Sequence, residues 1–192
     1  MGAPAAGAVT QGSVGVSQMA RLDIRIFGDP ILRMRALEVT EFDEALRELA
    51  DDMLDTLRAA QGAAIAANQV GVLKRVFVFD TQDRVGALVN PEVAETSLET
   101  ETADEGCLSF PGLYYPTERP LRARLRGQDV HGEPVEHAGE GMFARMLLHE
   151  LDHLNGILFI DHLARHDRKE AMRRIRRGEL EHPPQNIPAP EL

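Results

Sequence analysis

The segment MFARMLLHELDHL, residues 142–154, contains neither proline nor glycine, and its apolar residues predict a largely buried helix. HELDH at residues 149–153 matches the HExxH pattern, which places two imidazoles at i and i+4 on one helix face. Both can bind one metal ion, and Glu150 then lies where its carboxylate can accept a proton from a metal-activated water. The pattern also occurs on solvated helix faces. Here the apolar residues 146–148 favour the metal site, because unpaired buried histidines are costly.

A catalytic site of this kind needs a third protein ligand and an open position for water. Asp161 and His162 are the nearby choices downstream of the helix, whereas Cys107 lies upstream. Because Cys107 is the single cysteine, the chain has no internal disulfide framework, which fits a reducing compartment. A lone cysteine can be a metal ligand, a nucleophile or simply a small buried hydrophobe.

The rest of the chain predicts a mixture of helices and short strands. Apolar residues at helical spacing predict an N-terminal helix over residues 41–60, capped by Thr40 or Asp43. Short apolar or alternating runs predict strands at residues 75–79, 86–89 and 121–126, and a C-terminal helix is expected at residues 162–177. We therefore expect an α+β fold, with mostly antiparallel, short-stranded sheets around a central HExxH helix.

Length and composition predict one domain, in which we expect one active site. The chain has 192 residues, 43% of them hydrophobic, which suffices for one core at residues 21–180. Residues 1–20 and the proline-rich residues 181–192 are expected to be flexible tails. The formal net charge of -10 argues against direct DNA binding. The absence of a long apolar run or a basic leader argues against a membrane protein and favours the cytoplasm.

Three segments, taken in order, resemble the peptide deformylase family. GAAIAANQ at residues 62–69 is similar to the family's GxGxAAxQ motif, and EGCLS at 105–109 is identical to a second motif. HELDH at 149–153 matches the family's HExxH motif, with Asp152 before the second histidine. Similarity outside these motifs extends the resemblance over most of residues 26–162. Two positions depart from the pattern: Ala64 replaces the second glycine of the first motif, and Leu148 replaces the glutamine that commonly precedes the first histidine.

The resemblance implies a catalytic metal site. It assigns Cys107, His149 and His153 as ligands of one divalent ion, with ferrous iron as the expected metal and zinc, nickel or cobalt as possible occupants. It makes Glu150 the general base and acid, and it nominates Gln69 and the Leu108 N–H as oxyanion donors.

Further positions are open to two interpretations. Gln69 could bond only local backbone, and Glu105, Arg119 and Asp152 could orient a histidine or form a structural salt bridge. Four apolar residues could line a methionine pocket or belong to the ordinary core: Ile65, Leu148, Phe110 and Tyr114.

The implied substrate is an N-formyl-methionyl nascent peptide. The C-terminal helix is rich in arginine, and most such runs are only a solvated face. In this family, however, such a helix can dock on the ribosome, which makes ribosome contact a hypothesis here. Two other functions remain open, a metallopeptidase that cuts internal bonds and a non-catalytic relative that binds N-termini. Ala64 keeps the second alternative open, because an added methyl could hinder a substrate backbone.

Overall fold

The computed structural model describes residues 21–180, which form an α+β arrangement of three α-helices and two antiparallel sheets. The two expected tails, residues 1–20 and 181–192, lie outside the described residues. The helices are α1 (Glu44–Ala59), α2 (Met142–Leu154) and α3 (Arg165–Arg176). The strands are β1 (Ala64–Ala66), β2 (Val76–Asp80), β3 (Val85–Thr96), β4 (Thr100–Gly106), β5 (Tyr114–Pro120), β6 (Arg122–Gln128) and β7 (Pro134–Glu140). Short 3₁₀ turns are η1 (Pro30–Arg33), η2 (Ala67–Val70) and η3 (Phe159–Asp161).

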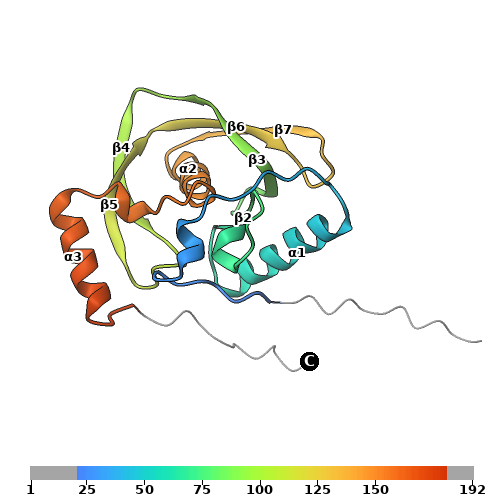
Figure 1. Ribbon diagram of the computed structural model, residues 1–192. Helices are drawn as coiled ribbons and strands as arrows, with labels where there is room; N and C mark the ends of the chain where they lie inside the picture. The colour runs from blue at the N-terminus through green and yellow to red at the C-terminus, as the bar shows by residue number, and fades with distance from the viewer. Residues whose placement is uncertain (1–20, 181–192) are drawn as a thin grey trace, which may run out of the picture.

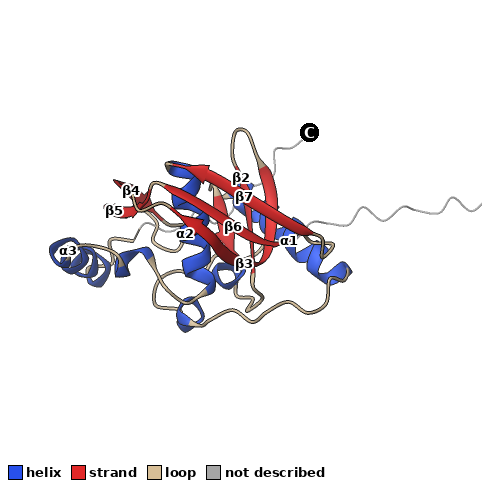
Figure 2. Cartoon of the chain, turned by 90° about the horizontal axis from the view of Figure 1, so that it is seen from above, coloured by secondary structure: helices blue, strands red, loops and turns tan. Residues whose placement is uncertain are grey.

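Both sheets pair their strands in antiparallel fashion. The larger sheet has the order β1-β2-β3-β6-β7, and β4 pairs only with β5. Helix α2 packs against β1, β6 and β7, and Figure 2 shows it lying across the five-stranded sheet. Figure 1 shows α2 between the β4–β5 pair on the left and α1 on the right. The helix with HELDH thus faces both sheets.

Helix α1 forms where the sequence predicts it, but it is shorter. Asp43 caps it, because its carboxylate accepts a hydrogen bond of 3.0 Å from the Leu46 N–H. The apolar stripe that includes Leu46, Met53 and Leu57 is fully buried in the cluster that also holds β2 residues. The cap excludes the first residues of the expected helix, and Thr40 is not the capping residue.

Helix α2 occupies the predicted residues and is buried on most of its circumference. Leu147, Leu151 and Leu154 join the core cluster that covers β2 and β6. At the end of the helix Gly156 has a φ of 74°, and an added Cβ would lie 2.5 Å from the Arg33 carbonyl oxygen. Glycine therefore lets the chain leave α2 close against η1.

The strands differ more from the expectation. Residues 86–89 are only the start of the twelve-residue strand β3, which continues through Asn90 and Pro91 by a register shift against β6. Asn90 accommodates this irregularity with a φ of 50°. The sequence patterns did not predict β1, β4, β5 or β7. Strand β3 is therefore longer than the short strand expected at residues 86–89.

Helix α3 begins three residues later than predicted. Leu163 precedes it, while Met172 and Ile175 pack with Leu163 in the cluster around Phe159. Arg168 of α3 binds Asp161 of η3 at 3.0 Å. Among residues 21–180 no helix is long and apolar enough to cross a membrane.

Candidate metal centre and active site

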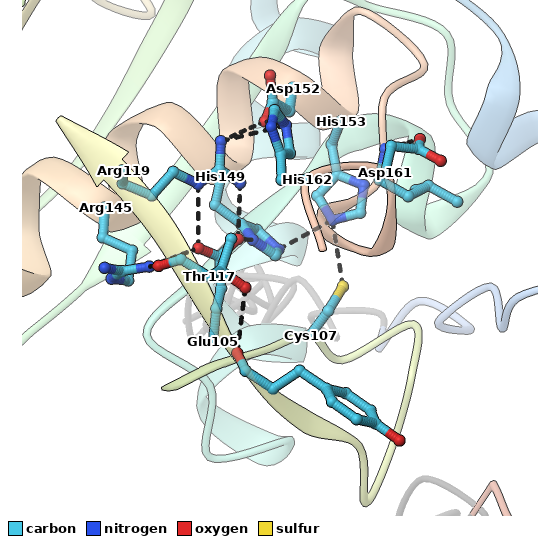
Figure 3. A network of polar contacts seen from close by, with 12 residues as sticks. Glu105, Cys107, Thr117, Arg119, Arg145, His149, Asp152, His153, Asp161 and His162 are labelled. Atoms are coloured by element: carbon cyan, nitrogen blue, oxygen red, sulfur yellow. Dashed lines mark hydrogen bonds and ion pairs between the residues drawn. The ribbon is translucent and has the colours of Figure 1, made fainter. Parts of the chain in front are cut away.

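Cys107 and the two histidines of HELDH converge on one point, although they come from separate elements. Cys107 follows β4, whereas His149 and His153 lie one turn apart on α2. The Sγ of Cys107 is 3.2 Å from Nε2 of His153, which is 3.1 Å from Nε2 of His149 (Figure 3). All three ligand atoms lie within 4.8 Å of one another. Asp161 and His162, the downstream choices for a third ligand, are not part of this cluster.

These donors suit a divalent transition metal. Bonds of about 2.0–2.3 Å to nitrogen and sulfur in a tetrahedral site place ligand atoms roughly 3.4–3.7 Å apart. The distances between sulfur and nitrogen and between the two nitrogens are close to this range. Burial and the neighbouring His149 charge lower the pKa of His153, which favours the neutral imidazole that a metal requires. The backbone N–H of Ser109 also donates a hydrogen bond of 3.4 Å to the Cys107 sulfur.

Glu105 orients the first histidine. Its Oε1 is 2.7 Å from Nδ1 of His149, so the imidazole can donate that proton and keep Nε2 for a metal. Burial alone would raise the pKa of Glu105, but hydrogen bonds from His149 and Arg119 outweigh it and hold the pKa well below the usual range. Glu105 is therefore a carboxylate, and it acts as a hydrogen-bond acceptor for the imidazole.

Glu150 is almost fully buried, and its Oε2 has no hydrogen-bond partner in the described part of the chain. Burial raises the pKa of Glu150 to about 7, while the charge of His149 opposes the shift. A carboxyl group with a pKa near neutrality can both accept and return a proton. Glu150 lines the same cavity as Cys107 and His149, two of the three candidate ligands.

Gln69 bonds to local backbone through its amide oxygen, and its amide nitrogen lies beside Cys107. Its Oε1 accepts a hydrogen bond of 2.9 Å from the Ala66 backbone N–H, within turn η2. Its Nε2 donates to the Ser109 hydroxyl at 3.2 Å and lies 3.5 Å from the Cys107 sulfur. The local bond thus fixes the amide, and the amide N–H₂ points to the metal cluster.

A cavity of about 450 Å³ opens beside the cluster. Its polar wall includes Gln69, Cys107, His149 and Glu150, and its apolar wall includes Leu108 and Met146. Of the four apolar residues expected at a methionine pocket, Tyr114 lines the cavity and is mostly exposed. The other three, Ile65, Leu148 and Phe110, belong to core clusters.

A model of the polypeptide deformylase family matches residues 21–169. The chain belongs to this family. The peptide deformylase of Acidothermus cellulolyticus is 50% identical over 161 residues, which cover 84% of this chain and 89% of that protein. Peptide deformylase 1 of Corynebacterium glutamicum is 49% identical over 162 residues, which cover 82% and 96% of the two chains.

Solved deformylase structures share the fold. The peptide deformylase of Legionella pneumophila is 37% identical, with a TM-score of 0.78 over 83% of this chain and 96% of that one. The peptide deformylase of Ehrlichia chaffeensis, in complex with actinonin, is 34% identical, with a TM-score of 0.79 over 85% and 100% of the two chains. The antiparallel α+β architecture is therefore that of the family.

The deformylase site also contains a buried charge network that sequence reasoning found only in part. Arg119 forms ion pairs with Glu105 at 2.7 Å and with Asp152 at 2.5 Å. Glu105 also contacts His149 and orients its imidazole. Two members were missed, Arg145 on α2 and His162, which lies 2.8 Å from Asp152. The signal for Arg145 was present in the sequence, because it is a cation within an otherwise apolar helical segment.

Proposed function

We propose that this chain removes the N-formyl group from the formyl-methionine at the start of nascent polypeptides, by metal-dependent hydrolysis. The observation that carries the proposal is the convergence of Cys107 with His149 and His153 beside the unpartnered carboxylate oxygen of Glu150. Family membership supports the substrate, because the relatives at about half identity are peptide deformylases. We also propose that residues 21–180 form one catalytic domain with the HExxH helix at its centre.

Cys107, His149 and His153 would hold one divalent ion, for which we propose ferrous iron. One thiolate and two imidazoles form a donor set that accepts ferrous iron, and zinc, nickel or cobalt as well. When bound, such an ion supplies Lewis acidity, which polarises the formyl carbonyl and makes water easier to deprotonate.

Glu150 moves the proton. It takes a proton from the attacking water as the new C–O bond forms at the formyl carbon. It then gives this proton to the departing nitrogen as the C–N bond breaks, so the products are formate and a free α-amine. The pKa of about 7 that burial gives Glu150 suits both steps near neutral pH.

Gln69 and Leu108 would stabilise the oxyanion that develops on the formyl oxygen. The Gln69 amide is held next to Cys107 by its bond to Ala66, so little reorganisation is needed. Leu108 directly follows Cys107 in sequence, so its backbone N–H belongs to the peptide bond that joins the two residues. Both are hydrogen-bond donors beside the proposed metal position.

The cavity supports a small acyl group and an apolar side chain. A formyl group carries only hydrogen beside its carbonyl, so a confined site can admit it and exclude larger acyl groups. Leu108 and Met146 provide apolar surface for the methionine side chain, and Ala64 adds a methyl at the same wall. We propose that Ala64 narrows this wall but leaves the cavity open.

We also propose that α3 touches the ribosome, which would place the reaction in the cytoplasm, where formylated chains emerge. Several arginines of α3 and its end are at least half exposed, including Arg168 and Arg177. Arg168 and Arg174 also bind acidic neighbours, so part of their charge is already compensated. A negatively charged RNA surface would attract the remaining charge.

The test of the proposed function is formate release from formyl-Met-Ala by anaerobically prepared protein. We expect turnover of the formyl dipeptide and no reaction with acetyl-Met-Ala. Cleavage of internal bonds in an unformylated peptide would instead identify a metallopeptidase. Binding of the formyl dipeptide without formate release would identify a non-catalytic relative, and either result would overturn the proposal.

A further inference from the structure

We propose that Arg145 is a positioning residue of the metal centre, which ties α2 to the β4–β5 hairpin and holds Glu105 against His149. The inference rests on the proposed metal-dependent function. Arg145 is 3% exposed, and it lies one helical turn before His149 on the same face of α2. A buried arginine in this place needs partners, and the hairpin supplies them.

Arg145 contacts both strands of the hairpin. Its Nη1 donates to the Thr117 carbonyl of β5 at 2.7 Å and to Oε2 of Glu105 at 3.1 Å. Its Nη2 donates to the Glu101 carbonyl of β4 at 2.9 Å. Figure 3 shows Arg145 on the side of Glu105 that faces away from the Cys107 sulfur. One side chain thus fixes the helix to two strands.

This brace matters because the metal ligands come from the two elements that it joins. His149 and His153 belong to α2, whereas Cys107 follows β4 and lies two residues after Glu105. Any shift of the hairpin along α2 would change the distance from the sulfur to the imidazoles. The planar guanidinium can hold several acceptors at once, which makes arginine suited to such a junction.

Glu105 shares its two oxygens between orienting a histidine and binding arginines. Oε1 faces Nδ1 of His149 and Nη2 of Arg119, each at 2.7 Å. Oε2 receives the Nε of Arg119 at 3.0 Å and the Nη1 of Arg145 at 3.1 Å. Without Arg145, the Glu105 carboxylate would still bind Arg119. It would lose the hydrogen bond that ties its Oε2 to α2.

In the described part of the chain, the His153 imidazole has no outer hydrogen bond of its own that could hold the imidazole pair in place if the orientation of His149 were lost. Nδ1 of His153 is buried and has no hydrogen-bond partner among residues 21–180. The orientation of the imidazole pair therefore depends on the Glu105–His149 contact. Outer partners of metal-binding histidines commonly change metal affinity by about 10- to 100-fold when they are replaced.

The test compares cobalt binding by wild type, R145M and R145K, measured anaerobically by competition with a chelator. Methionine keeps much of the volume of arginine but removes its donors, whereas lysine can pair with Glu105 without reaching both strands. We expect R145M to bind cobalt about 10- to 100-fold more weakly, with a weaker thiolate-to-cobalt absorption band, and R145K to lie between R145M and wild type. In the cobalt-saturated proteins, kcat should fall while KM for formyl-Met-Ala stays near the wild-type value.

R75M is the matched control. Arg75 is also buried, and it binds the Pro91 carbonyl at 3.0 Å and the Asn155 side chain at 2.9 Å, beyond the C-terminal end of α2. Its replacement should lower thermal stability while cobalt affinity and the absorption band stay at wild-type values.

Several results would overturn the inference. Wild-type affinity and absorption in R145M would remove the positioning role while leaving the proposed function intact. An equal loss of affinity in R75M would reduce the effect to general destabilisation. If R145M does not fold, a wild-type cobalt affinity in R145K would show that Arg145 is not a positioning residue. If wild type itself binds no cobalt, both this inference and the proposed function fail.

Discussion

Glu150 and Cys107 carry different parts of the proposed chemistry, and their surroundings separate the two roles. The Cys107 sulfur faces the imidazoles, while an oxygen of Glu150 has no partner within residues 21–180. A substitution at Glu150 can therefore remove proton transfer and leave the metal donors in place. Substitutions at these two residues can therefore distinguish catalysis from metal binding.

E150Q should retain the metal and lose activity. Glutamine keeps the shape of the side chain but cannot accept the proton from water, so kcat should fall by about 100- to 10,000-fold. Formate release and metal content are measured on the same sample, with C107S as a variant that should lose metal as well. Activity near the wild-type value in E150Q would exclude Glu150 as the base.

The raised pKa of Glu150 predicts a pH effect in the metal-free protein. Because its pKa is about 7 in the folded state and 4.5 when unperturbed, the folded state holds its proton more tightly. This group therefore contributes stability below pH 4.5, and the contribution is lost as pH rises to about 7. The glutamine side chain of E150Q does not titrate. Between pH 4.5 and about 7, the free energy of unfolding of wild type should therefore fall relative to that of E150Q, by on the order of 3 kcal/mol.

Urea unfolding of the chelated proteins between pH 4.5 and 8 measures this difference. The two stability curves should diverge up to pH 7 and run parallel above it. Curves that stay parallel from pH 4.5 upward would show that Glu150 keeps an ordinary pKa.

At the scale of the elements, α1 supports the fold from outside the metal centre. The Asp43 cap satisfies the Leu46 N–H, and α1 packs on β1 and β2. D43A should therefore lower the free energy of unfolding by about 1 kcal/mol, as typical for the loss of a capping carboxylate. Chemical unfolding measures the loss, and cobalt affinity should stay at the wild-type value, since a change would mean that α1 and the site are coupled.

Helix α3 offers an element-scale test of the proposed ribosome contact. Replacing Arg173, Arg176 and Arg177 by glutamine removes charge near the end of the helix and leaves the Arg168–Asp161 ion pair intact. Co-sedimentation with ribosomes should decrease, and turnover of formyl-Met-Ala should not change. Unchanged co-sedimentation at low salt would end the proposal, because charge attraction is strongest there.

Sequence patterns predicted the elements whose burial has a clear period. The bounds of α2 and the buried stripe of α1 follow from spacing alone. Strands β4 and β7 escaped prediction because they are polar and half exposed, and their stability comes from pairing with β5 and β6. Strand β3 was cut short because Asn90 and Pro91 look like a turn until β6 is seen to accommodate them.

At the scale of the whole molecule, the fold brings together what the sequence separates. EGCLS ends at residue 109 and HELDH begins at residue 149, so the two motifs are far apart in sequence. The β4–β5 hairpin nevertheless places Cys107 against α2. Motif resemblance predicted this cluster, and the structure does bring the three ligand residues together. The sequence marks Arg145 as a cation in an apolar helical segment, but it does not reveal the partners of that cation. Two of these partners are backbone carbonyls on strands that no pattern indicated, and the third is the Glu105 carboxylate.

The central claim is that one sulfur and two imidazoles of this chain bind one ion. X-ray absorption at the iron edge, on protein loaded anaerobically with ferrous iron, measures these ligands directly. We predict one iron per chain, bound by one sulfur and two imidazole nitrogens, with the sulfur signal lost in C107S. An iron shell of oxygen and nitrogen alone in the wild-type protein would contradict the account.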